Sequence, residues 1–396
     1  MEFGSDVLRD ELYESRLART RAAMTTNDVE ALLVTDPVNI QYATGASNMT
    51  IFSTRTPARY LLVLADGPVV LFDFFGGEHL SAALPTIDEV RAARGLCFVS
   101  SNGAVANQSA ALATEVAEIL TEHGLPIGPL AIDRFRFETA DALRAVGFSL
   151  TDADAVFCAA RRIKTPLEVA FMREAMRRVE SAVAEFEAEL RPGVTEAEAW
   201  SRFHQPFIAA NGQYVVSRLM QSGERTYPYF QECNERVIEA GDLVCLDTDA
   251  TAFDGYSVDF SRTFLVGDKR PTGAQRTLYA RAREQLAHNT SLIRLGVSFE
   301  DVARHAWPVP PENQASRYYC IGHGLGMSGE FPNLPFATPG EPYPLAGGFE
   351  PGMVFCVESY VGSAELHQGV KLEDQLLVTS TGVEVMNSYG FDDRLG

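Results

Sequence analysis

The sequence lacks the features of a protein that spans a membrane or binds an anionic polymer. No apolar run in its 396 residues approaches the roughly 20 needed to cross a bilayer. Acidic residues outnumber basic ones, with 53 Asp and Glu against 33 Lys and Arg, and the formal net charge is −20. Nucleic acids and anionic lipid surfaces attract basic patches. The composition therefore argues against a nucleic-acid or membrane partner.

Paired cysteines are also missing. The six cysteines are dispersed, form no Cys-x-x-Cys motif, and lie in apolar runs such as Phe355-Cys356-Val357. Buried free thiols are typical of a reducing compartment. The first residues, MEFGSDVLRDELYESR, lack the basic-then-apolar order of a signal peptide. We therefore expect a cytoplasmic location.

The order of helix-like and strand-like segments predicts two domains. Residues 1–160 alternate between the two types, with a hairpin in YLLVLADGPVVLFDF and a loop in PVNIQYATGASNMTIFSTRTPAR, which indicates an α/β domain. Thr165-Pro-Leu-Glu168 has the capping-box pattern and begins a long helix. The last third is rich in β-type runs. Residues 161–396 are thus expected to form a second, α+β domain.

The most informative stretch is Leu243 to Leu265, LVCLDTDATAFDGYSVDFSRTFL. Two β-type runs flank an Asp-Gly turn, which predicts a hairpin. Asp247 and Asp249 would share one face of a strand, and the returning strand would bring Asp259 close to them. Three carboxylates on one face repel one another unless a cation binds. A metal site and a solvated polar face are both compatible with this stretch taken alone.

Three later positions add possible ligands. His323 lies in Ile-Gly-His-Gly-Leu-Gly, where the glycines allow a close approach of backbone or ligand. Glu358 ends an apolar run, and Glu373 lies in Val-Lys-Leu-Glu-Asp. A lone histidine is more often structural, but burying an unpaired carboxylate is costly. Together the chain carries Asp, Asp, Asp, His, Glu, Glu in order on consecutive β-type segments.

These motifs resemble the pita-bread (creatinase/aminopeptidase) family. The matching phrases are LVCLDTDA, GYSVDFSRTF, GHGLG, PGMVFCVES, VKLEDQLLVT, ARRIKTPLEVAFMREA and RPGVTE. The resemblance implies a creatinase-like N-terminal domain, a pita-bread catalytic domain and a homodimer. It also implies two divalent metal ions bound by Asp247, Asp259, His323, Glu358 and Glu373. An oxygen-rich donor set with one imidazole suits iron, manganese, zinc or cobalt.

The chain departs from the peptidase members of this family. Asp247 and Asp259 lie one residue further apart than in the peptidases, and Asp249 is an additional carboxylate. The phrase SGERTYPYFQECNER contains no histidine, and Glu330 stands where peptidases carry a second one. Peptide hydrolysis at a metal centre needs groups that shuttle protons and hold the tetrahedral intermediate. Cleavage of Xaa-Pro bonds is therefore not expected.

A closer resemblance is to the dimethylsulfoniopropionate lyase (DddP) branch of the family. That branch shares the Asp-Thr-Asp signature with Asp249 as a sixth ligand, and it favours iron. The phrases SGERTYPYFQEC, Asn39-Ile40, Tyr42-Ala43-Thr44 and Asn48-Met49 also match. The resemblance implies β-elimination of dimethyl sulfide from dimethylsulfoniopropionate, which leaves acrylate.

Candidate catalytic and substrate-binding residues follow from the same resemblance. Tyr318 matches a pocket tyrosine, and Tyr229 and Phe331 are further aromatic candidates that could face a sulfonium cation. Gly329 stands where the lyases of this branch carry an aspartate that is proposed as the base. Either the adjacent Glu330 or a metal-bound hydroxide would then take the proton, or the substrate differs.

Two other functions stay open at this point. One is a metallohydrolase of a small C–N or amide bond, such as a dipeptidase, which would use the same dinuclear site. The other is a pita-bread protein without catalytic activity that binds a ligand or partner. Such relatives tend to lose metal ligands, whereas all six candidates stand in this sequence.

Overall fold

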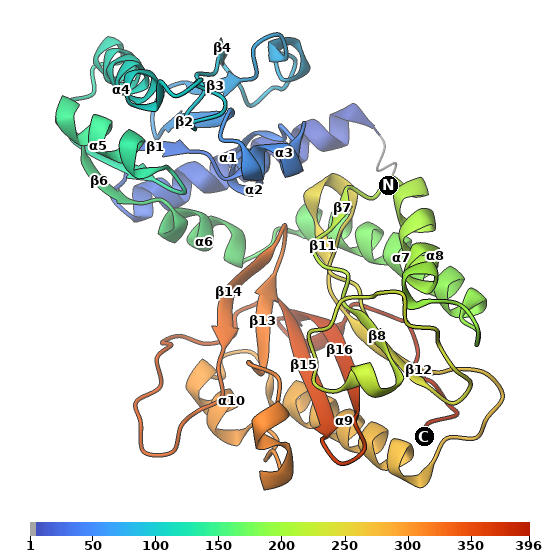
Figure 1. Cartoon of the computed structure of the whole chain (residues 1–396). Coiled ribbons are helices and arrows are strands. Elements are labelled where there is room, and N and C mark those ends of the chain that lie inside the picture. The colour runs from blue at the N-terminus through green and yellow to red at the C-terminus, as the bar shows by residue number, and fades with distance from the viewer. Residues whose placement is uncertain (1–4) are drawn as a thin grey trace. The chain divides into compact units, whose positions relative to one another are not determined.

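The computed structural model describes residues 5–396, which divide into two compact units with the boundary between Arg161 and Arg162 (Figure 1). Each unit has a sheet and a hydrophobic core of its own. Within the described residues, no helix is both long and apolar enough to cross a bilayer.

The first unit is built on a six-stranded sheet in the order β4-β3-β2-β1-β5-β6. Its strands are β1 (Ala31–Val34), β2 (Tyr60–Leu64), β3 (Val69–Asp73), β4 (Glu89–Ala92), β5 (Pro129–Ile132) and β6 (Ser149–Asp152). Its helices are α1 (Asp6–Thr26), α2 (Pro37–Thr44), α3 (Thr50–Arg55), α4 (Val105–Glu122), α5 (Phe137–Val146) and α6 (Asp154–Arg162). The apolar face of α4 packs on the buried central strands and forms the core.

The predicted hairpin in this unit is confirmed, because β2 and β3 pair antiparallel. The predicted loop after β1 is wrong, since α2 and α3 occupy it. The α2 helix has clear local signals. Asp36 caps it by accepting hydrogen bonds from the backbone of Val38 and Asn39, Pro37 holds its first position, and Gly45 ends it with φ 84°.

The second unit contains a five-stranded sheet, β14-β13-β15-β16-β17, and two small sheets, β12-β9-β8 and β11-β10-β7. Its strands are β7 (Tyr214–Val215), β8 (Met220–Ser222), β9 (Leu243–Asp247), β10 (Ala250–Thr251), β11 (Ser257–Val258), β12 (Ser261–Leu265), β13 (Gly322–Leu325), β14 (Gly329–Leu334), β15 (Val354–Ser363), β16 (Gln368–Thr379) and β17 (Gly382–Val385). Its helices are α7 (Pro166–Glu189), α8 (Glu196–Ala209), α9 (Gly273–Leu292) and α10 (Phe299–His305). The capping box predicted at Thr165 is formed.

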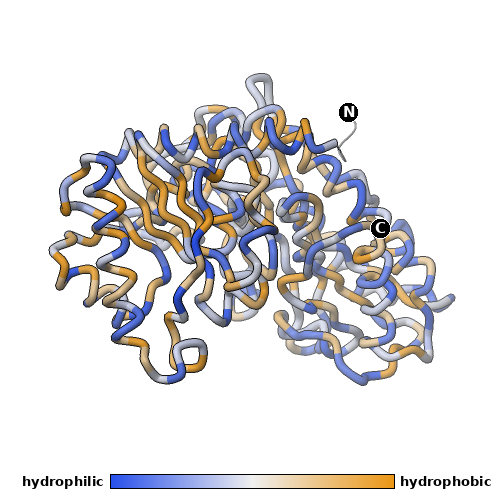
Figure 2. Tube along the Cα trace, turned by 90° about the horizontal axis from the view of Figure 1, so that it is seen from above, coloured by the Kyte–Doolittle hydropathy of each residue, from blue (hydrophilic) through white to orange (hydrophobic). Residues whose placement is uncertain are grey.

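The long strands β15 and β16 separate the core from the site. Phe355 and Val357 are fully buried in one hydrophobic cluster with residues of α9. Successive side chains of a strand point to opposite faces, so Cys356 and Glu358 point away from that cluster. Figure 2 shows apolar segments concentrated in the interior strands, with hydrophilic segments on outer turns and helix faces. One face of this sheet therefore makes the core, and the other presents polar groups.

The predicted hairpin of the second unit is confirmed, with Asp247 opposite Ser261 and Leu243 opposite Leu265. Its end differs from the expectation. Asp249 does not continue the strand but has a left-handed backbone with φ 39°, so strand alternation does not place it beside Asp247. Asp254, also with a positive φ of 51°, lies in a short 3-10 turn, as its Asp-Gly sequence indicates.

Candidate metal centre

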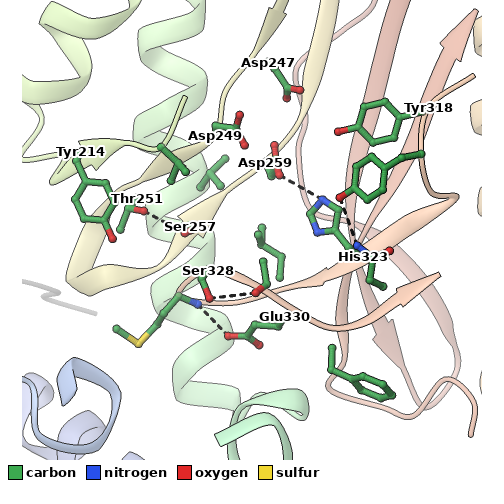
Figure 3. Close-up of a pocket in the computed structure, with 18 residues that line it drawn as sticks. Tyr214, Asp247, Asp249, Thr251, Ser257, Asp259, Tyr318, His323, Ser328 and Glu330 are labelled. Carbon is green, nitrogen blue, oxygen red and sulfur yellow. Dashed lines mark hydrogen bonds and ion pairs between the residues drawn. The ribbon is translucent and has the colours of Figure 1, made fainter. Parts of the chain in front are cut away.

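Four of the six predicted ligands line one cavity of the second unit, which has a volume of about 530 Å³ (Figure 3). Asp247 ends β9, Asp249 follows it, and Asp259 lies between β11 and β12. These three carboxylates line the cavity together with the imidazole of His323 on β13. The remaining two ligands come from the paired strands β15 and β16, where Glu358 stands opposite Glu373.

His323 lies between carboxylates from three different strands or loops. Its Nε2 atom is 3.5 Å from Oδ2 of Asp259, 3.4 Å from Oε1 of Glu358 and 4.0 Å from Oε1 of Glu373. The glycines beside it allow this packing. A Cβ atom at Gly322 would lie 2.2 Å from the carbonyl oxygen of Cys356, a distance that no side chain permits.

The cluster is under strong electrostatic strain without a bound cation. Burial and then the neighbouring carboxylates raise the pKa of Asp259 and of Glu373 well above the ordinary values. Burial and the nearby Asp247 raise the pKa of Asp249 to about 6. Burial disfavours a charged imidazole, but the contact with Glu358 outweighs it and raises the pKa of His323 to about 9. The raised pKa values mean that these side chains hold on to protons, which a bound metal ion would displace.

The donor atoms fit a metal ion. Oδ1 of Asp259 and Oε1 of Glu373 are buried and have no hydrogen-bond partner among the described residues. Ligand atoms of Asp259, His323, Cys356 and Glu373 all lie within 4.8 Å of one another. Buried acceptors without donors are costly, and a divalent cation would satisfy them. The carboxylate-rich set with one imidazole agrees with the borderline metals that the sequence suggested.

Lys371 is buried inside the same cluster. Its ammonium lies 2.7 Å from Glu358, 2.8 Å from Glu373 and 3.3 Å from Asp247. Burial alone raises the pKa of Asp247, but Lys371 and the hydroxyl of Tyr229 hold it below its usual value. The pKa of Lys371 itself lies well above its ordinary value, because the three carboxylates outweigh burial.

The predicted aromatic residues occupy different places. Tyr318 and Phe331 line the cavity. Tyr229 lies behind the ligands, and its hydroxyl donates a hydrogen bond of 2.6 Å to Oδ2 of Asp247. Its ring packs on that of Tyr318, with centroids 5.7 Å apart. Tyr229 therefore orients a carboxylate, a role that the sequence interpretation did not include.

Glu330 lines the cavity, but partners hold both of its carboxylate oxygens. Oε2 accepts a hydrogen bond of 2.7 Å from the ammonium of Lys164. Oε1 accepts one of 3.2 Å from the backbone of Met327 (Figure 3). Both charged side chains are almost fully buried, at 2% exposed for Lys164 and 7% for Glu330. Next to them, a Cβ atom added at Gly329 would meet no atom within 4 Å.

Two residues of this region were not found from the sequence. Lys164 precedes the capping box, and no local pattern connects it with a residue 166 positions away. Cys356 carries a usable signal, because it lies two residues before Glu358 on the same strand and hence on the same face. Free cysteines in apolar runs are usually core residues, and the sequence analysis therefore interprets Cys356 as a buried thiol and not as a possible ligand.

Comparison with known proteins places both units in described families. The metallopeptidase family M24 matches residues 170–380, and the creatinase/prolidase N-terminal domain matches residues 16–163. The dimethylsulfoniopropionate lyase DddP of Roseovarius nubinhibens is 34% identical over 97% of this chain and 87% of its own length. The probable dipeptidase PepE of Mycobacterium tuberculosis is 27% identical over 97% of both chains.

Solved structures share the fold at lower identity. A recombinant prolidase from Thermococcus sibiricus has a TM-score of 0.77 and 21% identity, covering 96% of this chain and 98% of its own. An Xaa-Pro dipeptidase from Bacillus anthracis has a TM-score of 0.75 and 21% identity, covering 96% and 99%. These similarities establish the arrangement of the chain and leave the reaction open.

Proposed function

This chain belongs to the metallopeptidase family M24, and on that premise we propose that it is a metal-dependent carbon–sulfur lyase. The substrate is dimethylsulfoniopropionate or a similar small carboxylate with a cationic leaving group. Two divalent ions, with iron favoured and manganese, zinc or cobalt as alternatives, would be held by the six ligands. The active form would be a homodimer in the cytoplasm.

The position of Asp249 is the structural observation that favours a lyase reaction over a peptidase reaction. Asp249 leaves the strand and turns its carboxylate into the cavity beside Asp247 and Asp259, as expected of a sixth ligand. The cavity is lined by one imidazole, that of His323, and the further histidines expected of a peptidase are not among its lining residues. The higher identity to the lyases than to the dipeptidase points the same way.

In this β-elimination the protein has to orient the substrate and provide one proton acceptor. Bound divalent ions would act as a Lewis acid toward the substrate carboxylate and stabilise the charge that develops on it. A base removes the Cα proton, and that electron pair forms the double bond of acrylate. The C–S bond breaks, and its electrons leave with dimethyl sulfide. The ring of Tyr318 on the cavity wall can face the sulfonium, which is worth about 0.5–2 kcal/mol.

Our candidate for the group that accepts this proton is Glu330 on β14, which lines the cavity. Because Lys164 and the Met327 backbone already bind its oxygens, it would have to exchange one of these partners for the substrate. A slow elimination is therefore expected. Gly329 offers a direct test, because its backbone is not left-handed and an added side chain meets open space. Gly329→Asp should raise the rate of dimethyl sulfide release at least about tenfold.

The decisive assay uses protein purified and loaded separately with iron(II), manganese, zinc or cobalt. Headspace chromatography would detect dimethyl sulfide, and acrylate should form in equal amount. Asp259→Ala should abolish release, whereas Asp254→Asn, which removes a carboxylate from the turn of the same hairpin, should not. A fully metallated protein that releases no dimethyl sulfide, even as Gly329→Asp, would exclude this substrate.

A dipeptidase-type metallohydrolase is the second candidate, favoured by the shared donor set and by the similarity to PepE. The same metallated samples should be offered a panel of dipeptides. Turnover of a dipeptide without dimethyl sulfide release would replace the lyase by the hydrolase, with the metal site unchanged.

A further inference from the structure

The ammonium of Lys371 is the centre of a closed arrangement behind the metal ligands. Lys371 lies on β16 two residues before Glu373, so both side chains share one face of the sheet. It is fully buried. Besides the three carboxylates described above, the hydroxyl of Ser261 lies 2.6 Å from its nitrogen. The rings of Tyr229 and Tyr318 cover the remaining side, with centroids 5.5 and 5.0 Å away.

This arrangement gives the two oxygens of each glutamate different partners. Oε2 of Glu358 and Oε2 of Glu373 contact Lys371. Oε1 of each instead faces Nε2 of His323, at 3.4 and 4.0 Å. Oε1 of Glu373 is buried without a hydrogen-bond partner among the described residues, and Oε2 of Glu358 has the ion pair with Lys371 but no hydrogen bond. Lys371 thus holds the rear oxygens and leaves the front oxygens directed toward the other ligands.

The charges support the same assignment. The five carboxylates of the ligand set and the ammonium of Lys371 together carry −4, which two divalent ions neutralise. Without the lysine, the set would carry −5 and two divalent ions would leave one charge uncompensated. Without metal, Lys371 is the cation that contacts Asp247, Glu358 and Glu373, which would otherwise lie buried against one another at high cost.

We propose that Lys371 is a positioning residue that acts as a resident counter-ion. It orients Glu358 and Glu373 for metal and keeps the catalytic unit folded before metal arrives. Loss of its charge makes folding of this unit depend on metal. The inference rests on the dinuclear site of the proposed function, and it is independent of the substrate.

The test compares thermal unfolding of the catalytic unit within the full chain, with excess Mn²⁺ and with EDTA. Lys371→Met removes the charge with little change in length, and Lys371→Arg keeps the charge. Ser261→Ala is the matched control, because it removes a neutral group that contacts Lys371 and two of the same carboxylates, Asp247 and Glu373. All proteins are produced and purified with Mn²⁺.

The metal-induced rise in Tm should be larger in Lys371→Met than in the wild type by about 10 °C, because the Tm in EDTA falls while the Tm with Mn²⁺ is largely kept. Lys371→Arg and Ser261→Ala should show the wild-type rise. An equal loss of Tm in both conditions, or a Lys371→Met protein that does not fold with saturating Mn²⁺, would overturn the proposal. A wild-type protein that binds Mn²⁺ but releases no dimethyl sulfide would refute the lyase alone.

Discussion

The buried pair of Lys164 and Glu330 allows a stability role and a catalytic role to be separated. Lys164→Met would leave the Glu330 carboxylate inside the protein without its ammonium. Breaking a buried ion pair by removing one partner costs about 3–5 kcal/mol. For a unit of this size, that corresponds to a fall in Tm of roughly 6–20 °C. Differential scanning calorimetry at neutral pH would measure it.

The double variant Lys164→Met/Glu330→Gln makes the prediction specific. Replacing both partners removes the unpaired charge, so the double variant should be more stable than Lys164→Met. With Glu330→Gln as the second single variant, the cycle should give a coupling energy of at least about 1 kcal/mol. Strictly additive losses would show that the two side chains do not depend on each other, and the reasoning from their 2.7 Å contact would be wrong.

Activity of the same three proteins then identifies the role of Glu330. If Glu330 accepts the substrate proton, the double variant regains stability while dimethyl sulfide release stays at least about a hundredfold below the wild type. If Glu330 is held only for the fold, stability and turnover recover together. The second outcome would assign proton removal to another group and exclude Glu330 as the base.

Four further predictions concern the metal centre. Asp259→Ala should lower the metal content measured by mass spectrometry from two ions to at most one, with an unchanged far-ultraviolet circular dichroism spectrum. The pKa of His323, about 9 without metal, predicts that Mn²⁺ binds about a hundredfold more weakly at pH 7 than above pH 9, measured by calorimetry; a pH-independent affinity would contradict it. In the metal-free protein, the stabilisation from charged His323 is complete below pH 6.5 and is lost as the pH rises through 9. Tyr229→Phe removes the hydrogen bond to Asp247 and should weaken metal binding about 10- to 100-fold.

Features that depend on a few neighbouring residues could be predicted from the sequence. The capping box at Thr165 and the two hairpins follow from local hydrogen bonding and side-chain alternation, and the structure contains them. The helix α2 also has local signals, in Asp36, Pro37 and Gly45. It was missed because its short sequence between two strands has the composition of a loop.

The sequence predicts which side chains lie near one another at the site, but it does not predict their geometry. The sequence order of ligands identified which side chains gather, and strand pairing brings Glu358 opposite Glu373. Alternation failed at Asp249, because the chain leaves the strand there with a left-handed backbone. The roles of Lys164 and Tyr229 depend on contacts between segments distant in the sequence, and no spacing rule gives such contacts.

Gly329 bears on the question of which group removes the substrate proton, and sequence and structure each give part of the answer. The sequence establishes that a carboxylate expected of a lyase is missing, and glycine cannot take a proton. The structure adds that the missing side chain has left open space, with no neighbour within 4 Å of an added Cβ and no left-handed backbone that would require glycine. The fold would therefore accept an aspartate at this position without rearrangement. Gly329 lines the cavity, so this difference from the lyases lies where the base and the substrate of the proposed reaction would meet.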